Sequence, residues 1–310
     1  MKSVICITGC TATGKSRIAE EIAKIRPSVI INADSIQVYR CMRVLSSRPS
    51  EDDFENLENR LYGHVECGVD YSVGKWLHDV EIAIKYSQNR EKTPIIVGGT
   101  GLYFSALFKG LSFIPSISKE TRKESEELRK KSPESFLIDL KANDIKTYEN
   151  IDRQNVVRVQ RAWEVLTDTG YGLSYWLQEK PSPFLHEYEH NRFIISCEKS
   201  SLEDNISNRS HKMFEQGVDL EVKRIQNSNL LSNATHPAHK AIGFSVVCQY
   251  IQGKLSLEEA TNAINIKTRQ YAKRQRTWFR NQMQDWENLE LNTKDDLVET
   301  AKLIDAKCLN

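Results

Sequence analysis

Residues 9–16, GCTATGKS, have the spacing of a phosphate-binding loop: a glycine, four residues, and then Gly14, Lys15 and Ser16. Small residues in such a loop let consecutive backbone amides point at an anion, and the positive end of the following helix adds to the attraction. Lys15 supplies a charge, and the Ser16 hydroxyl is a suitable magnesium ligand. The segment follows a strand-like run and opens a helical pattern, which favours phosphate binding over a tight turn with an incidental lysine.

A carboxylate and an amide lie in the next motif, NADSIQVY at 32–39. Asp34 can accept a proton and Gln37 can bond the edge of a base, so the pair suits an amino-bearing heterocycle. The alternative is that Asp34 caps a helix that begins at Ser35. The aspartate that a nucleotide hydrolase usually carries after a second strand is replaced by glycines in TPIIVGG at 93–99.

Glycines flank Thr100 in VGGTGLY, residues 97–103. Without side chains they would let the backbone approach a ligand and free the Thr100 hydroxyl to point into a pocket. A plain strand-to-helix turn explains the same pattern equally well.

The segment IKTRQYAKRQRTWFRN, residues 266–281, has six basic residues and no acid. On a helix, one basic stripe would consist of Arg269, Lys273, Arg276 and Arg280. Tyr271 and Trp278 would form an adjacent aromatic stripe. This combination suits a phosphate backbone and an unstacked base, and a solvated face with core-packed aromatics is the alternative. A smaller cluster, Arg158 with Arg161, is either a second contact to the same nucleic acid or ordinary surface.

Strands must position these motifs. The β-rich runs at 3–9, 28–35 and 93–101 are separated by helical stretches, a pattern that predicts a doubly wound parallel sheet. Ligands of such sheets bind at the carboxyl ends of the strands. We therefore expect Gly14, Asp34 and Thr100 at one edge.

From about residue 116 the sequence is charged and has helical spacing at Val156, Val159 and Trp163, which predicts a helical insertion. The run RFIISCE at 192–198 predicts a strand that returns to the sheet, and the rest reads as helix to about 286. The expected fold class is α/β, a P-loop NTPase-like parallel-sheet core with an inserted helical domain. The core would comprise residues 1–115 and 190–310, and the insertion residues 116–189.

The composition is that of an ordinary globular chain of 310 residues with 43 basic and 42 acidic side chains, so attraction to nucleic acid must come from where the charges lie. No stretch approaches the roughly 18 apolar residues of a membrane span, and the apolar N-terminus leads into the phosphate loop. We therefore expect a cytoplasmic protein without membrane contact. The seven cysteines form no CxxC pair, which predicts reduced thiols and neither disulfides nor a zinc site.

In this order the motifs resemble those of the tRNA dimethylallyltransferases, also called tRNA isopentenyltransferases, of the bacterial type. The matching stretches span residues 9–280 and are GCTATGKS, NADSIQVY, IVGGTGLY, NVVRVQRAWEV, HKAIGF and RQYAKRQRTWFR. Members of the family transfer a dimethylallyl group from dimethylallyl diphosphate to the exocyclic amine of the adenosine 3′ of the anticodon, in tRNAs that read codons beginning with U. The resemblance implies that the loop holds the diphosphate leaving group, that Mg2+ is the cofactor, that the anticodon stem-loop of tRNA is the partner, and that the protein is a monomer.

The resemblance also implies site residues. It makes Asp34 the general base and gives Lys15 and Thr100 catalytic roles, with Ser16 as the magnesium ligand. The implied diphosphate-binding residues are Gly9, Thr11, Ala12, Thr13, Gly14, Lys15, Ser16 and Arg209. The implied tRNA-binding residues are Asp34, Ser35, Ile36, Gln37, Thr100, Arg122, Gln154, Arg158, Lys240, Gly243, Lys273, Arg274, Gln275, Arg276, Trp278 and Arg280, and the C-terminal helices of the core would carry the last of these.

Some positions depart from the family's pattern. Cys10 replaces the usual proline and Thr13 a common serine, and both changes leave the glycines and lysine of the loop intact. Asn155, Lys199 and Asn205 replace arginines, which implies weaker contacts to tRNA or diphosphate. Three other functions stay open: an adenylate isopentenyltransferase acting on free adenine nucleotides, a P-loop small-molecule kinase, and an RNA-binding protein without enzymatic activity. The basic segment at 266–281 favours the tRNA enzyme over the first of these.

Overall fold

The computed structural model of the chain describes residues 3–50, 52–54, 57–178, 183–228, 237–291 and 296–308. Contacts divide the chain into two compact units: unit 1, residues 1–107 with 184–310, and unit 2, residues 108–183. In the described part of the chain, no helix is both long enough and apolar enough to cross a membrane.

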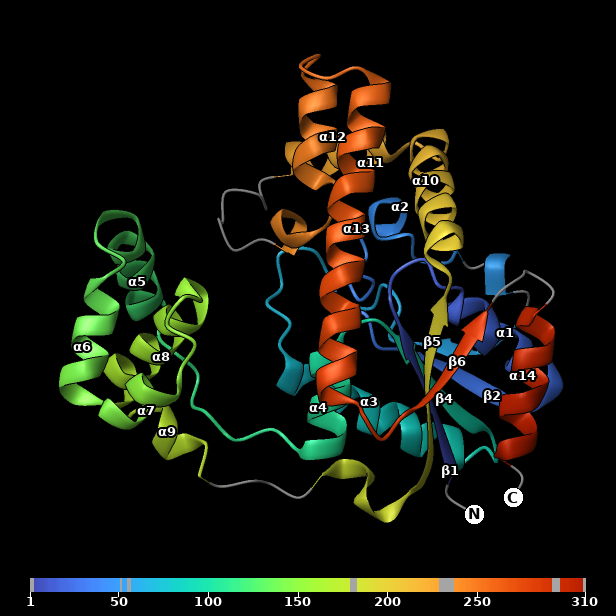
Figure 1. Cartoon of the computed structure of the whole chain (residues 1–310), viewed down its shortest axis with the longest axis horizontal. Helices are drawn as coiled ribbons and strands as arrows, with labels where there is room; N and C mark the ends of the chain where they lie inside the picture. The colour runs from blue at the N-terminus through green and yellow to red at the C-terminus, as the bar shows by residue number, and fades with distance from the viewer. Residues whose placement is uncertain are drawn as a thin grey trace. The chain divides into compact units, whose positions relative to one another are not determined.

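Unit 1 is built on a parallel sheet. The three predicted strands form its centre as β1 (Ser3–Gly9), β2 (Ser28–Asn32) and β4 (Thr93–Gly98), because their apolar side chains are buried on both faces. The strand order is β3-β2-β4-β1-β5-β6. The strand expected at 192–198 is β5 (Glu189–Cys197), which pairs with β1 in parallel (Figure 1). The predicted α/β parallel-sheet core is thus confirmed.

Two strands of this sheet lie outside the sequence-based prediction. The first, β3 (Asn59–Arg60), pairs with β2 over two residues, which is too short for an alternation signal. The second, β6 (Glu287–Leu291), follows directly after the long C-terminal helix and pairs with β5. The expectation of helix to about 286 was therefore wrong for the last residues of that stretch, because α13 ends at Gln282.

Helices pack on the sheet. On one face, α1 (Lys15–Ile25) and α14 (Asp296–Lys307) share an apolar cluster with alternate residues of the central strands. Val29, Ile31 and Ile96 alternate with these residues along the strands and so point to the opposite face of the sheet, where they are buried as well. Helix α3 (Val73–Gln88) packs against β2 and β4, and α4 (Gly101–Lys109) follows β4 directly.

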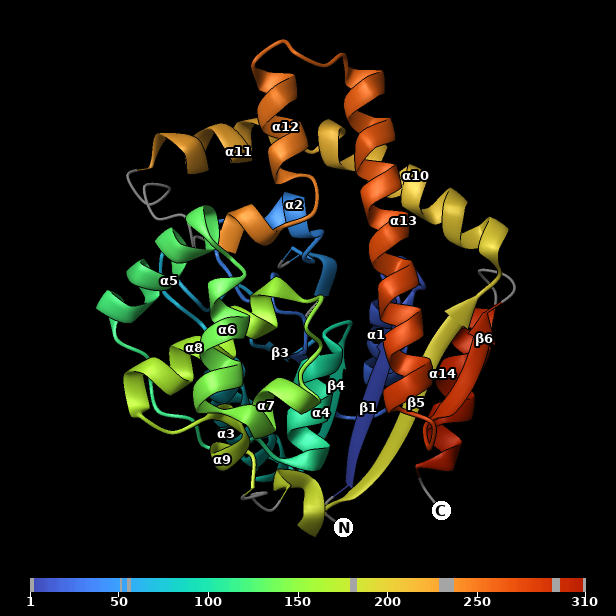
Figure 2. The same ribbon diagram turned by 60° about the vertical axis from the view of Figure 1, so that its left-hand side comes forward.

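A helical layer stands beyond the carboxyl ends of the strands. It contains α2 (Arg43–Ser46), α10 (Lys199–Glu215), α11 (Val218–Asn227), α12 (Phe244–Ile251) and α13 (Leu257–Gln282). These helices share a second apolar cluster with residues that follow β2. Figures 1 and 2 show α13 running from this layer past the strand ends of the sheet. Short 3-10 turns lie at Asp52–Phe54, Phe184–Glu187 and Pro237–Lys240.

Unit 2 is helical in its described residues, as the sequence predicts for this region. It contains α5 (Lys119–Lys131), α6 (Ser135–Asn143), α7 (Ile145–Asn150), α8 (Val156–Thr169) and α9 (Leu173–Trp176). Of the residues whose spacing predicts α8, Val159 and Trp163 lie in the small core of the unit, whereas Val156 is exposed at the first turn.

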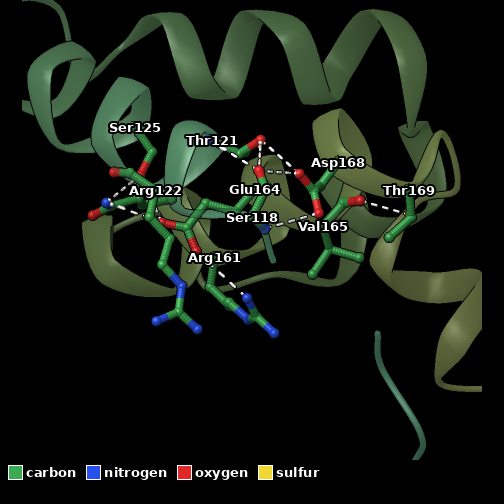
Figure 3. Close-up of polar contacts among 10 residues, drawn as sticks. Ser118, Thr121, Arg122, Ser125, Arg161, Glu164, Val165, Asp168 and Thr169 are labelled. Atoms are coloured by element: carbon green, nitrogen blue, oxygen red, sulfur yellow. Dashed lines mark hydrogen bonds and ion pairs between the residues drawn. The ribbon is translucent and has the colours of Figure 1, made fainter. Parts of the chain in front are cut away.

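Polar contacts join α5 to α8 in unit 2 (Figure 3). The Asp168 carboxylate accepts hydrogen bonds from the hydroxyls of Ser118 and Thr121, at 2.6 and 2.7 Å, at the start of α5. One turn earlier on α8, the buried Glu164 accepts a bond of 2.6 Å from Ser125. These contacts fix the register of the two helices.

The cysteines differ from the sequence-based expectation. Cys41 and Cys67 form a disulfide with Cα atoms 6.0 Å apart, a separation typical of such a bridge. The expectation of reduced thiols throughout was wrong for this pair, because residues 26 apart in the sequence approach only through the fold. The free cysteines are Cys6, Cys10, Cys197, Cys248 and Cys308.

Candidate active site

A cavity of about 1080 Å³ opens in unit 1, and the phosphate loop, Asp34–Gln37, Arg209 and Tyr271 line it. Since β2, β4 and β1 are neighbours, the segments that follow them meet at one edge of the sheet, as the sequence predicts.

The phosphate loop has the conformation that its sequence requires. Gly14 lies at the N-terminus of α1 with a left-handed φ of 87°, which favours glycine. The Thr13 hydroxyl donates to the Cys10 carbonyl at 2.9 Å, so Thr13 closes the loop on itself. Lys15 donates to the same carbonyl at 3.0 Å. Burial lowers the pKa of Lys15 to about 8, although the nearby Asp34 carboxylate opposes this shift.

Ser16 fits a magnesium ion. Ser16 lines the cavity next to Lys15, and its hydroxyl makes no hydrogen bond to any described residue. A hard cation such as Mg2+ prefers oxygen ligands, and it usually completes its shell with water and the oxygens of a substrate phosphate.

Helix α10 supplies two side chains to the phosphate loop. Arg209 donates to the Thr11 hydroxyl and, on its other side, to the Ser46 carbonyl at 3.0 Å. Burial lowers the pKa of Arg209, and the Asp34 charge opposes this shift. Asn205, at a position where the resemblance implies an arginine, donates to the Ala12 carbonyl at 3.1 Å. This replacement therefore keeps a contact with the loop, whereas Lys199 is exposed and lies near Glu203.

Asp34 lies in a turn that its own carboxylate stabilises. Oδ1 accepts the backbone N–H groups of Ile36 and Gln37, at 2.8 and 3.2 Å. Oδ2 accepts no hydrogen bond from any described residue, and Asp34 lines the cavity. Residues 35–38 form a turn and no helix. Asp34 therefore caps this turn, whereas the alternative in the sequence was that it caps a helix. Behind the turn, the fully buried Asn32 accepts the Asp34 N–H at 3.0 Å and donates to the Leu61 carbonyl.

Thr100 joins the strand-end loops of β4 and β2. Its hydroxyl accepts the Ser35 N–H at 2.9 Å and donates to the Ser35 hydroxyl at 3.3 Å. The neighbouring glycines face α13. A Cβ atom on Gly99 would lie 2.4 Å from Nε2 of Gln275, and one on Gly101 would lie 2.3 Å from the Trp278 ring. These glycines therefore let α13 pack closely against the loop that follows β4.

The basic stripe predicted on α13 is present. Arg269, Lys273, Arg276 and Arg280 are all exposed, and none forms an ion pair with a described residue. Arg274 is exposed as well and lines the cavity. Tyr271 lines the cavity, where burial raises its pKa, while Trp278 is partly buried against Gly101. Gln275 is buried and lies in the lining of the same cavity.

The other residues implied by the family pattern lie in three places. Lys240 is exposed and lines the cavity, whereas Gly243 is buried and begins α12 with a φ of 93°. In unit 2, Arg122, Gln154 and Arg158 are exposed. Figure 3 shows the side chains of Arg122 and Arg161 extending in the same direction from α5 and α8.

Sequence reasoning missed several residues that shape this site. The Asn32 side chain holds the Asp34 turn, and the only sequence signal was an amide at the end of an apolar strand. Glu221 accepts the backbone N–H groups of Val44 and Leu45, at 2.8 and 2.9 Å, and thereby holds α2 against α11. Nothing in its local sequence indicates this contact.

Comparison with known proteins identifies the family. A family model described as IPP transferase matches residues 37–282, and one described as isopentenyl transferase matches residues 2–71. The chain belongs to the IPP transferase family. Among curated relatives, the tRNA dimethylallyltransferase of Dinoroseobacter shibae is 42% identical over 91% of this chain and 93% of its own, and that of Rhizobium etli is 39% identical over 93% and 97%.

Solved structures of the IPP transferase family have the same fold. The full-length tRNA isopentenylpyrophosphate transferase from Bacillus halodurans aligns with 100% of this chain and 97% of its own, with a TM-score of 0.69 and 26% identity. A eukaryotic dimethylallyltransferase acting on tRNA aligns with 98% of this chain and 78% of its own, with a TM-score of 0.82. At 23% identity, the second likeness concerns the fold alone.

Proposed function

We propose that the protein transfers a dimethylallyl group from dimethylallyl diphosphate to the exocyclic amine of an adenosine in tRNA and releases diphosphate. The observation that carries this proposal is the cavity of unit 1. A phosphate loop and an acceptor carboxylate, Asp34, line the same cavity, beside a helix with an exposed basic stripe. The family and its curated tRNA dimethylallyltransferases support it.

The phosphate loop would hold the leaving group. As the bond between the allylic carbon and the diphosphate oxygen breaks, negative charge develops on the diphosphate. Amides at the start of α1, the Lys15 ammonium and the Arg209 guanidinium are fixed donors at this position. Magnesium held by Ser16 would add its charge to the same oxygens.

Asp34 would act as the general base. The adenine amine is a poor nucleophile because its lone pair is shared with the ring. As the new carbon–nitrogen bond forms, one amine proton moves to the carboxylate, which leaves a neutral secondary amine on the base. Oδ2 is the oxygen available for this proton, since Oδ1 accepts the amides of the turn.

The tRNA would bind along the exposed face of α13, and unit 2 would contribute Arg122, Gln154 and Arg158. The adenosine must leave its stack to reach the diphosphate, as in other enzymes that modify a base. We further propose that this is the adenosine 3′ of the anticodon in tRNAs that read codons beginning with U. The protein would act on this substrate as a monomer in the cytoplasm.

Two other enzymes share parts of this site. An adenylate isopentenyltransferase would use the loop and Asp34 on free nucleotides, but the basic stripe of α13 would then have no purpose. A P-loop kinase usually has an aspartate after a second strand, whereas β4 ends at Gly98 and is followed by Gly99. Both observations favour the tRNA enzyme.

The deciding experiment supplies labelled dimethylallyl diphosphate and magnesium to an unmodified anticodon stem-loop with three consecutive adenosines, with AMP in a parallel reaction. We expect label in the RNA and none in AMP. A stem-loop with inosine at the target position is the matched control, because inosine lacks the amine and should take up no label. Label in AMP alone would overturn the proposal.

A further inference from the structure

One side chain of α13 reaches into the site instead of toward solvent. Gln275 is only 6% exposed, and its amide lies between the phosphate loop and the loop after β4. Oε1 accepts the Thr11 N–H at 2.9 Å, and Nε2 donates to the Gly99 carbonyl at 2.8 Å. The two partners fix the orientation of the amide, because the backbone N–H of Thr11 can only donate and the carbonyl of Gly99 can only accept.

The backbone around Gln275 is fitted to this contact. Gly99 and Gly101 leave room for Gln275 and Trp278, where any larger residue would clash. One turn earlier on α13, the Ala272 carbonyl accepts the thiol of Cys10 at 3.3 Å. The helix is therefore attached to the phosphate loop at two residues that lie one turn apart, Ala272 and Gln275.

The two loops that Gln275 joins lead to the two halves of the proposed reaction. Thr11 is bound to Arg209, on the diphosphate side. Gly99 precedes Thr100, whose hydroxyl holds Ser35 next to Asp34, on the adenine side. The Gln275 amide thus helps to set the distance between the diphosphate leaving group and the general base, Asp34.

The same helical turn carries part of the basic stripe on its exposed side. Arg276 follows Gln275 directly and Lys273 lies two residues before it, and both are exposed members of the basic stripe. These residues lie within one turn of α13, a continuous helix of 26 residues, and such a turn moves as one body. An RNA strand bound to the outer face of the helix would therefore restrain the Gln275 amide on the inner face.

We propose that Gln275 is a positioning residue that couples RNA binding on α13 to diphosphate binding in the phosphate loop. The proposal rests on the proposed function, since it requires both ligands. RNA bound to α13 would hold the amide in place, the amide would order Thr11 and Gly99, and diphosphate would then bind a loop that is already arranged. By linkage, diphosphate must tighten RNA binding by the same factor.

The test measures binding of inorganic diphosphate with magnesium by calorimetry, with and without a saturating unmodified anticodon stem-loop, a mixture in which no transfer can occur. For the unaltered protein we expect RNA to lower the diphosphate Kd by about fivefold or more, a common size for such coupling. In Gln275→Met, which has a side chain of similar length without the amide, we expect a ratio of about one. Gln270→Met, on the exposed face of α13, should keep the full ratio.

A ratio in Gln275→Met equal to that of the unaltered protein would overturn the proposal, and so would a ratio of one in the unaltered protein. If Gln275 had a purely structural role, Gln275→Met would bind diphosphate more weakly by the same factor with and without RNA. The ratio of the two Kd values would then equal that of the unaltered protein, which is the first of these results. If Gln275→Met does not fold, Gln275→Glu provides the same test. It keeps an acceptor for Thr11 but loses the donor to Gly99, so its ratio must fall. Absence of dimethylallyl transfer by the unaltered protein would overturn the proposed function instead, while leaving the ratio measurable.

Discussion

At the scale of single residues, the Asp34 carboxylate combines a structural role with the catalytic role that we propose for it. Its Oδ1 atom holds a turn through two backbone amides, and this keeps the carboxylate at the cavity wall. Asn32 fixes the start of the same turn from behind. The capping role and the catalytic role that compete in the sequence are therefore compatible, because each uses a different oxygen.

The first prediction separates these two oxygens. Asn at position 34 still offers Oδ1 to the amides of Ile36 and Gln37 but cannot accept a proton. In Asp34→Asn we expect kcat for dimethylallyl transfer to fall by about 10²- to 10⁴-fold, the usual contribution of a general base. RNA affinity, measured by filter binding, should stay at its original value. Turnover equal to that of the unaltered protein would remove Asp34 from the mechanism.

Lys15 gives a second prediction at this scale. Burial lowers its pKa to about 8 in the free protein, and a bound diphosphate must raise this pKa because it stabilises the ammonium. Diphosphate binding therefore takes up a proton at Lys15 above pH 8, and the Kd should rise as the pH increases from 8 to 10. Calorimetry at several pH values measures this rise.

Lys15→Met is the control for the lysine titration. It lacks the ammonium, so only the titration of diphosphate itself acts on its Kd, and this part is common to both proteins. Equal pH dependence in Lys15→Met and the unaltered protein would show that Lys15 keeps its charge throughout.

At the scale of elements, α13 has different chemistry on its two sides. Its inner side, with Gln275 and Trp278, packs against the loop after β4, whereas the basic stripe is exposed. The sequence predicts the exposed stripe well, because charge recurs with the helical period. It cannot predict which polar residue turns inward, since Gln275 stands between two basic residues and has no distinguishing neighbours.

The third prediction concerns the basic stripe. Each phosphate contact releases counterions, so Lys273→Ala and Arg276→Ala should weaken RNA binding and lower the slope of log K against log salt by about 1 each. Binding at several salt concentrations measures this slope. Lys302→Ala removes an exposed charge from α14 and should leave the slope unchanged. A slope that stays the same in all three variants would return the stripe to an ordinary solvated surface.

The elements also show where sequence reasoning stops. The central strands and α1 are predictable because their apolar periodicity is strong and their residues are buried. Strand β6 follows a 26-residue helix and lies at the edge of the sheet, so its alternation is weak and its pairing depends on β5. The contact of Glu221 with α2 joins residues about 177 positions apart, and no local pattern records such a contact.

At the scale of the whole molecule, the near balance of charge hides the basic stripe on α13. The formal net charge is only +1, yet the stripe on α13 has no acidic partner among the described residues. Each unit also has its own apolar core, and in unit 2 the polar contacts between α5 and α8 add to that core.

The last prediction concerns the stability of the fold. The Cys41–Cys67 disulfide closes a loop of 26 residues that contains α2 and β3. Closing a loop of this length in the unfolded chain stabilises the folded state by about 3 kcal/mol. Urea unfolding followed by tryptophan fluorescence should therefore show a lower free energy of unfolding, by about that amount, when a reductant is added.

Two cysteine variants separate the disulfide from other effects of the reductant. Cys67→Ser should unfold at the same urea concentration with and without reductant, since it cannot form the bridge. Cys248→Ser removes a free thiol and should respond to reductant as the unaltered protein does. Thiol titration of the denatured, unreduced protein gives an independent answer, because five of the seven cysteines should react if the bridge is present. Seven reactive thiols, together with unchanged unfolding, would show that packing and hydrogen bonds hold the loop without the bridge.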